Sequence, residues 1–534
     1  MIGLMVICFC PDKSVFGQTR SNPRVSSQTN QVLQNASDFI RSGKFAEAET
    51  ILREYLVKTP KDNKARILLA VALDQQNRTS EAEEIYRQVL KTNPKELSAL
   101  SNLGILLAKT NRIPEAIETL EGVLRIQPGH QQARYNLAAL YTTRNEFQKA
   151  LPLLEGLLGI TARQKTPKTD DLALLFSLTK TYAALGKTKE AEAAAAILEA
   201  QNPEDERLLF TLGLVLAESN MYEKARDLFE KVNRKKPENF DVLYNLGVTY
   251  YNLDRLDQAR TSFQKAADLN PSAPEVFYRL GLIASAKGES ENALGFWLKS
   301  LELRPEYPEA NFLIAEELSR RSLYTGATDF YQKASRQQPA SVLYQVRLCV
   351  NFIRLRQYEK ARAVLDQADS KNPDQLNLVF LRGFLARAEG VYDEAIEAFE
   401  KVLKMSPKNA DAMANLGFLA YQRGEDQKAE KLLRETLKLD PDNFSAHYDL
   451  GRLLVRLKRF DEALPVLERG VKLEKNDPGI QYQLFIAYSR LKQKKKADAA
   501  LAEFKRLEKL VSPTSGSAMS DESGRDVPNL SEDN

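Results

Sequence analysis

The spacing of the prolines is the feature that most constrains how this chain can fold. Prolines recur at residues 60, 94 and 128, and then at residues 203, 237, 271, 305, 339, 373, 407 and 441. Every step is 34 residues except the one from Pro128 to Pro203, which is 75 residues, or two periods and seven residues more. One register held over most of the chain indicates tandem units of a single structural kind, with one seven-residue insertion.

Residues 241–271 show what one unit contains. Two amphipathic runs are separated by a short break at residues 253–255, and Pro271 ends the second run. The first run carries Leu246, Gly247 and Tyr250, and the second carries Ala259, Phe263 and Ala266. Apolar residues at this spacing predict two helices joined by a turn.

Three positions of the unit predict how the helices pack. Position 20 is alanine in all fourteen units: Ala48, Ala82, Ala116, Ala150, Ala191, Ala225, Ala259, Ala293, Ala327, Ala361, Ala395, Ala429, Ala463 and Ala497. Position 8 is mostly glycine or alanine, so we predict that the two helices approach closely there. This close packing would offset the low helix propensity of glycine. Position 15 is glycine at 43, 186, 288, 390 and 424, asparagine at 77, 111, 145 and 220, and aspartate at 254. These residues tolerate a left-handed backbone, so position 15 is expected to end the first helix.

The period, with Leu-Gly, Tyr, Ala, Phe, Ala and Pro at these offsets, resembles the tetratricopeptide repeat. The resemblance implies an all-α fold, a right-handed α-solenoid (superhelix) of about fourteen 34-residue helix-turn-helix repeats. Stacked neighbours would then share one continuous core. We divide the chain into a leader (residues 1–28), repeats 1–4 with a loop insertion (29–171), repeats 5–14 with a charged C-terminal cap (172–511) and a disordered acidic tail (512–534).

The first residues leave two interpretations open. Residues 2–10 form a short apolar run, and a cleavage site near Gln18 would make it a secretory signal, although no Lys or Arg precedes the run. The alternative is a disordered leader. A signal peptide would place the protein in the periplasm or outside the cell, and its absence would place it in the cytoplasm. No apolar run in the sequence approaches the roughly 18 to 20 residues of a membrane-spanning helix.

The sequence holds few groups suited to catalysis. It contains 2 histidines and 3 cysteines, and neither histidine has ligands at metal-site spacing. Cys349 occupies position 8, so we interpret it as a packed substitute for glycine or alanine. We find no phosphate-binding loop and no nucleophile elbow. We therefore predict a protein that is not an enzyme and holds neither cofactor nor metal. A net charge of +4 argues against nucleic acid as the partner.

In the family that the chain resembles, positions 2, 5, 6, 9, 12 and 13 of each first helix line a concave groove that binds peptides. The aromatic candidates at position 5 are Tyr135, Phe210, Tyr244, Tyr278, Phe312 and Tyr448, and the amide candidates at position 6 are Asn102, Asn136, Asn245 and Asn415. Aromatic faces and amides would suit an extended peptide. Both preferences also belong to the general family pattern, so a structural role stays open.

Arginine gathers at groove positions in the C-terminal half of the chain. The candidates are Arg279, Arg320, Arg347, Arg354, Arg387, Arg452 and Arg456. A guanidinium presents a planar fork of donors that matches carboxylate oxygens, so we hypothesise that this half of the groove binds an acidic segment. The alternative is internal pairing with the groove acids Glu275, Glu309, Glu316, Asp411 and Asp449. The carboxylate clamp of chaperone-binding relatives is not predicted, because Phe210 and Leu214 replace its first Lys and Asn.

The leading functional prediction is a non-enzymatic protein–protein interaction scaffold that binds protein or peptide partners in its groove. One alternative is an accessory protein of bacterial cell-envelope assembly, secretion or polysaccharide export. Another is a substrate-recruiting subunit of a separate enzyme. The acidic tail could itself occupy the groove. The partner and the oligomeric state are left open by the sequence.

Overall fold

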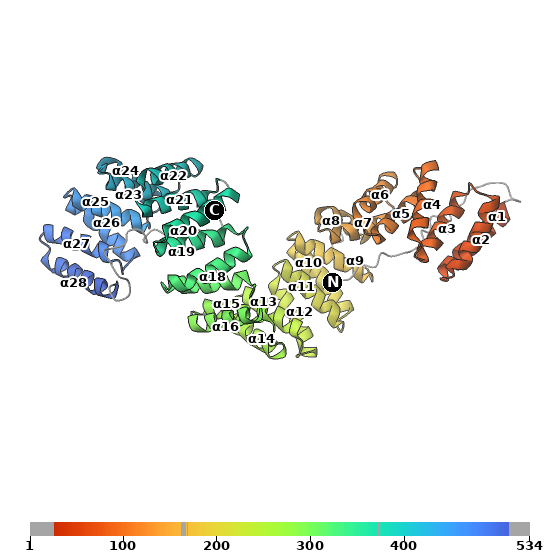
Figure 1. Ribbon diagram of the computed structural model, residues 1–534. Helices are drawn as coiled ribbons and strands as arrows, with labels where there is room; N and C mark the ends of the chain where they lie inside the picture. The colour runs from red at the N-terminus through yellow and green to blue at the C-terminus, as the bar shows by residue number, and fades with distance from the viewer. Residues whose placement is uncertain (1–25, 162–166, 168, 372–373, 512–534) are drawn as a thin grey trace. The chain divides into compact units, whose positions relative to one another are not determined.

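The computed structural model describes residues 26–161, 167, 169–371 and 374–511. These residues form 28 helices and no strand, and consecutive helices pack side by side as antiparallel pairs (Figure 1). Each pair is one repeat, so the predicted all-α solenoid of fourteen helix-turn-helix units is confirmed. The odd-numbered helices also contact one another, for example α23 with α25 and α25 with α27, and they form the more closely packed layer.

The helices fall into two compact units, residues 1–270 and 271–534. The helices of the N-terminal unit are α1 (Ser26–Arg41), α2 (Phe45–Lys58), α3 (Asn63–Gln75), α4 (Thr79–Thr92), α5 (Leu97–Lys109), α6 (Ile113–Ile126), α7 (Gln131–Thr143), α8 (Phe147–Leu157), α9 (Leu172–Ala184), α10 (Thr188–Gln201), α11 (Glu206–Glu218), α12 (Tyr222–Lys235), α13 (Phe240–Asn252) and α14 (Leu256–Leu269).

The helices of the C-terminal unit are α15 (Pro274–Ala286), α16 (Ser290–Leu303), α17 (Pro308–Arg320), α18 (Tyr324–Gln337), α19 (Val342–Arg354), α20 (Tyr358–Lys371), α21 (Leu376–Glu389), α22 (Tyr392–Met405), α23 (Ala410–Gln422), α24 (Asp426–Leu439), α25 (Phe444–Arg456), α26 (Phe460–Leu473), α27 (Pro478–Arg490) and α28 (Lys494–Val511). The division of the repeats at the insertion stays a prediction. The leader up to residue 25, part of the insertion (162–166 and 168) and residues 512–534 lie outside the described residues.

Position 15 has a left-handed backbone in every repeat. The glycines, asparagines and aspartate expected there have φ between 57° and 82°, so this prediction is confirmed. Four repeats place other residues at position 15: Ser322, Arg356, Lys458 and Lys492 have φ between 56° and 63°. The turn geometry is therefore imposed by the repeat even where the side chain disfavours it.

Lys458→Gly is expected to raise the free energy of unfolding by about 0.5–1 kcal/mol, because glycine adopts φ near +63° without a Cβ penalty. Urea unfolding followed by circular dichroism measures the change. Lys431→Gly is the matched control, since Lys431 is exposed in the middle of α24 and glycine should destabilise a helix interior by about 1 kcal/mol. Equal destabilisation by both changes would contradict the assignment.

The glycines at position 8 make room for the large side chain at position 24. A Cβ on Gly213 would lie 2.6 Å from the Phe229 ring, and one on Gly247 would lie 2.8 Å from Phe263. All fourteen alanines at position 20 are buried. Close packing of the two helices thus explains both small positions, as predicted.

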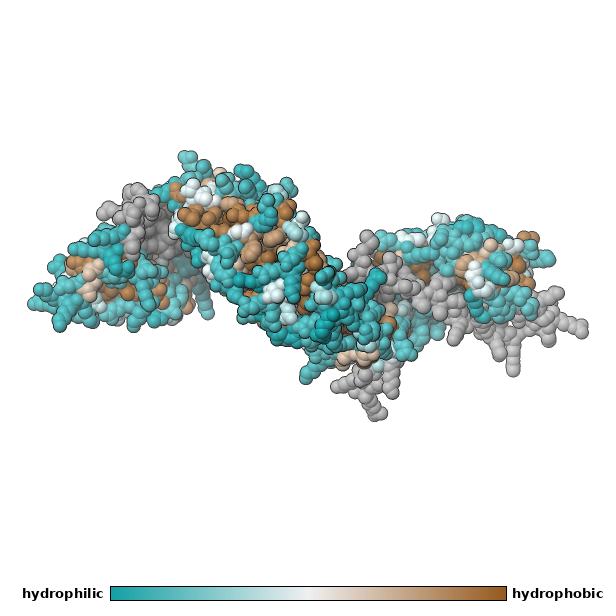
Figure 2. Space-filling view, turned by 90° about the horizontal axis from the view of Figure 1, so that it is seen from below, coloured by the Kyte–Doolittle hydropathy of each residue, from teal (hydrophilic) through white to brown (hydrophobic). Residues whose placement is uncertain are grey.

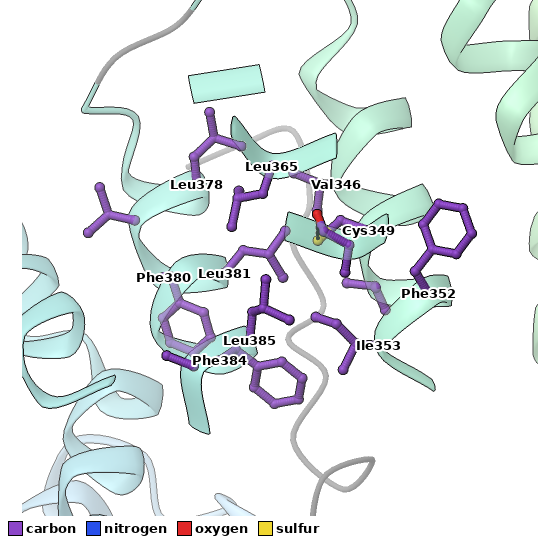
Figure 3. Packing of buried hydrophobic residues seen from close by; sticks show 14 of the residues in the cluster. Val346, Cys349, Phe352, Ile353, Leu365, Leu378, Phe380, Leu381, Phe384 and Leu385 are labelled. Carbon is purple, nitrogen blue, oxygen red and sulfur yellow. Dashed lines mark hydrogen bonds between the residues drawn. The ribbon is translucent and has the colours of Figure 1, made fainter. Parts of the chain in front are cut away.

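The core of the C-terminal unit continues from one repeat to the next. Figure 3 shows side chains of α19, α20 and α21 packed together, among them Val346, Leu365 and Phe384. Cys349 belongs to this cluster and is fully buried, with its Sγ 3.4 Å from the Ala361 carbonyl oxygen. This placement agrees with its interpretation as a packing residue. Outside the core, hydrophilic side chains cover most of the visible face, and apolar ones gather in narrower bands (Figure 2).

Ion pairs at position 16 link consecutive repeats. Arg78 pairs with Glu49 of the preceding repeat at 2.9 Å and with Glu81 of its own repeat at 2.6 Å. Arg112 and Arg459 repeat this arrangement with Glu83 and Glu115, and with Glu430 and Glu462. Burial raises the pKa of Glu83, but hydrogen bonds from Arg87 and Arg112 outweigh it and hold that pKa below its ordinary value. The pKa of Glu49 is lowered in the same way.

These lowered pKa values predict a loss of stability in acid. The ion pairs contribute fully above the unfolded-state value of about 4.3 and lose their contribution as the pH falls through the lower folded value. The double variant Arg78→Gln and Arg112→Gln should therefore lose less unfolding free energy than the native chain between about pH 6 and pH 3. Urea titrations at several pH values measure this difference. An unchanged pH profile in the double variant would contradict the role of the ion pairs.

Candidate functional site

Several of the aromatic candidates at position 5 pack against aromatic rings of the core. The Phe210 ring is 5.6 Å from Phe229, and the Tyr244 ring is 5.6 Å from Phe263. Phe312 lies 4.7 Å from Tyr344 and 6.1 Å from Tyr331. Tyr135 and Tyr278 are half-buried, whereas Tyr448 is buried. Each described ring pair joins position 5 to its own repeat or a neighbour, so these rings have a structural role whether or not they bind a partner.

The amide candidates at position 6 divide by exposure. Asn102 and Asn245 are half-buried, and Asn136 and Asn415 are each only 3% exposed. Asn245 and Asn415 donate from Nδ2 to the carbonyl oxygen four residues earlier, at 2.8 Å in both cases. These amide donors are thus used within their own helices. Their part in partner binding stays a prediction.

Three of the arginine candidates stack on aromatic rings of α21, α23 and α25. Arg387 is 6% exposed and lies 4.9 Å from the Phe384 ring and 5.1 Å from the Phe418 ring. Arg452 and Arg456 lie over Tyr421 at 4.3 Å and 3.7 Å.

Two of these arginines also pair with acids. Arg452 pairs with Asp449 at 2.9 Å, and Arg456 pairs with Asp426. Cation–π contacts and ion pairs therefore already engage these guanidinium groups. For them the structure favours the internal-pairing alternative.

Three other arginine candidates meet at one pocket. Arg320 of α17 and Arg347 and Arg354 of α19 line a pocket of about 340 Å³. The other lining residues are Ser285, Trp297, Leu313, Glu316, Glu317, Ser319, Tyr331 and Val350. Most of these residues lie on α15, α17 and α19, the first helices of three consecutive repeats. We call this the α17–α19 pocket. Arg279, also on α15, is half-buried and does not line it.

The acidic side of the α17–α19 pocket is already paired. Glu317 is 6% exposed and receives hydrogen bonds from Arg320 at 2.7 Å and from Arg321 at 2.9 Å. Burial raises the pKa of Glu317, but these hydrogen bonds outweigh it and hold the pKa below its ordinary value. Glu316 accepts a hydrogen bond from the Tyr331 hydroxyl at 2.5 Å. Both carboxylates are therefore already engaged by neighbouring side chains.

The arginines of the pocket are only partly paired with acidic side chains. Arg347 Nε lies 3.6 Å from Glu316 Oε1, too far for a hydrogen bond, and has no other partner among the described residues. Arg354 donates to Ser319 Oγ at 3.2 Å and lies 5.1 Å from the Tyr324 ring. Within the described part of the chain, Arg354 forms no ion pair. Ser319 and Tyr324 thus hold a guanidinium that no acid of the described residues neutralises.

The other groove acids named as possible partners are engaged elsewhere. Glu275 pairs with Arg304 at 3.4 Å, and Glu309 accepts from Gln338 at 3.1 Å. Asp411 accepts from Asn443 at 3.1 Å. Sequence reasoning missed Glu317, Val350 and Ser285 as pocket residues. Their positions 10, 9 and 12 recur along the first helices, and that register could have pointed to them.

The described residues hold neither a cluster of metal ligands nor a membrane-spanning helix. No group of three or more His, Cys, Asp or Glu within them could hold a metal ion. His130 accepts a hydrogen bond from the Ala133 backbone N–H at 3.2 Å and so caps α7. None of the helices in these ranges combines the length and apolar character needed to cross a bilayer.

Models of the tetratricopeptide repeat match most of the chain. They match residues 39–109, 107–166, 216–280, 386–450 and 427–482, and a second model of the same repeat matches residues 178–240 and 350–410. These matches agree with the helix pairs and with the 34-residue register. The chain therefore belongs to the tetratricopeptide-repeat family.

The chain matches numerous solved structures. The chain is similar to one in the crystal structure of the APC/C hetero-tetramer Cut9-Hcn1, with 15% identity, 87% of this chain and 97% of that chain covered, and a TM-score of 0.37. Yeast Tom70 is 15% identical, with 90% and 99% covered and a TM-score of 0.36. YrrB, a TPR protein with an unusual peptide-binding site, is 26% identical, with 35% and 97% covered and a TM-score of 0.31. No curated protein sequence matches the chain.

Proposed function

We propose that this protein is a non-enzymatic protein-binding scaffold whose C-terminal unit binds an acidic segment of a partner protein at the α17–α19 pocket. The family fold supplies a row of first helices, and a scaffold of this kind is consistent with a role in protein interaction. One observation carries the proposal. Arg354 lines the pocket without an ion-pair partner among the described residues, beside an Arg347 that is only loosely paired.

Charge and preorganisation both favour binding of a carboxylate in the α17–α19 pocket. A carboxylate entering the pocket would meet two guanidinium groups, and hydrogen bonds between ionised groups are the strong ones. Ser319 and Tyr324 already hold Arg354, so less side-chain freedom is lost on binding. Arg320 adds little, since Glu317 neutralises it.

Binding of short peptides to the full-length protein tests the proposal. A fluorescein-labelled peptide of ten glutamates should raise its fluorescence anisotropy on binding, and a peptide of ten glutamines should not. The affinity should fall as salt rises, because exposed charges are screened. Equal binding of the two peptides would overturn the proposal of an acidic partner segment.

A further inference from the structure

The α17–α19 pocket has an apolar floor as well as a basic rim. Trp297 of α16 and Val350 of α19 line it and are 2% and 5% exposed, and the half-buried Leu313 of α17 lies beside them. Trp297 is fixed in place by a hydrogen bond of 3.2 Å from Nε1 to the Tyr278 carbonyl oxygen. The floor is thus a fixed apolar surface.

The size of the pocket limits what can enter it. Its volume of about 340 Å³ lies near the lower end of the range for ligand sites, about 300–1,000 Å³. This space suits one or two side chains of a bound segment and not a whole helix. A polyglutamate chain would supply carboxylates to the arginines of the rim. It would leave the apolar floor covered by a polar side chain or by water.

We infer that the pocket selects an acidic segment in which one aliphatic or aromatic side chain neighbours the carboxylate. The apolar side chain covers Leu313 and Val350, and the carboxylate meets Arg354 and Arg347. This inference rests on the proposed function and narrows it, because the floor discriminates among acidic segments that the arginines alone would bind alike. In pockets that combine apolar walls with a few polar groups, the apolar walls provide affinity and the polar groups fix the orientation of the ligand.

Three peptides of equal length test the inference on the full-length protein. The first has one leucine flanked by two glutamates on each side, the second has serine in place of leucine, and the third keeps the leucine but has glutamines in place of the glutamates. By fluorescence anisotropy, the leucine–glutamate peptide should bind at least tenfold more tightly than the serine peptide. The serine peptide should in turn bind more tightly than the glutamine peptide.

The outcomes separate the two proposals. Leucine–glutamate and serine peptides that bind within twofold of each other overturn the role of the apolar floor and leave acidic binding standing. A glutamine peptide that binds as tightly as the leucine–glutamate peptide overturns acidic binding itself. If the leucine–glutamate peptide shows no measurable binding, the inference is overturned as well.

Two pocket variants test whether the preference for leucine over serine arises in the α17–α19 pocket. Leu313→Gln should reduce the preference for leucine over serine to less than threefold and leave the serine peptide within twofold of its native affinity. Ser285→Trp provides a second test that does not touch the core, because Ser285 is exposed at the rim and a bulky side chain there fills the space. Leu298→Gln, at a 48% exposed position of α16, is the control and should change nothing. A preserved leucine preference in both pocket variants overturns the inference.

Discussion

Trp297→Ala is expected to lower the free energy of unfolding of the C-terminal unit by about 3–5 kcal/mol. Trp297 is 2% exposed and belongs to a buried cluster with Ala284, Ala293 and Ile314. The substitution removes this apolar surface and leaves a cavity that the facing helices α15 and α17 can only partly fill. In a repeat array each repeat contacts only its neighbours, so weakening one interface should also broaden the transition or split it into two.

Urea unfolding followed by circular dichroism measures this loss. Fluorescence is unsuitable, because Trp297 is the only tryptophan in the chain. Leu298→Ala is the matched control on the same helix, since Leu298 is 48% exposed and its loss should change the free energy of unfolding by less than about 0.5 kcal/mol. A loss below about 1 kcal/mol for Trp297→Ala would contradict its place in the core.

Arg354→Glu is expected to weaken binding of an acidic peptide by at least about thirtyfold, or about 2 kcal/mol. The change removes a guanidinium that forms no ion pair with the described residues and puts a carboxylate in its place. Because Glu316 and Glu317 already lie in the pocket, a third acid should repel an acidic peptide strongly. Arg354→Gln, which removes the charge without reversing it, should cause a smaller loss.

Lys438→Glu makes the same charge change on the exposed side of α24, outside the pocket. At physiological salt, with a screening length of about 8 Å, it should alter the affinity by less than about twofold. Equal losses for Arg354→Glu and Lys438→Glu would show that net charge, and not this pocket, governs binding. Unchanged circular dichroism spectra would confirm that both variants are folded.

The repeat architecture could be predicted from the sequence because the same local packing requirement recurs in every repeat. It therefore appears as the same residue preference every 34 residues. The alanines at position 20 and the glycines at position 8 report helix contacts within one unit, so their spacing alone indicates the fold. The exceptions have a physical cause. Lys458 and Arg356 adopt a left-handed backbone that their side chains disfavour, because the surrounding repeat imposes the turn.

The candidate site was predictable only in part. The repeat positions predicted Arg320, Arg347 and Arg354 as groove residues, and in the structure these three arginines line one pocket. The same positions predicted Arg387 as a groove residue, yet its guanidinium is buried against Phe384 and Phe418. Whether an arginine stacks, pairs or remains uncompensated depends on side chains of neighbouring repeats. A repeat register does not determine those contacts.

Site-specific crosslinking in the source cells tests the central claim most directly. A photoactivatable amino acid at position 285, on the rim of the α17–α19 pocket, is compared with the same group at position 438 on α24. Mass spectrometry then identifies the partner segment joined to each position. The proposed function predicts crosslinks from position 285 to a protein segment rich in Asp and Glu, and their loss in Arg354→Glu. Crosslinks that come only from position 438, or segments without acidic residues at position 285, would contradict it.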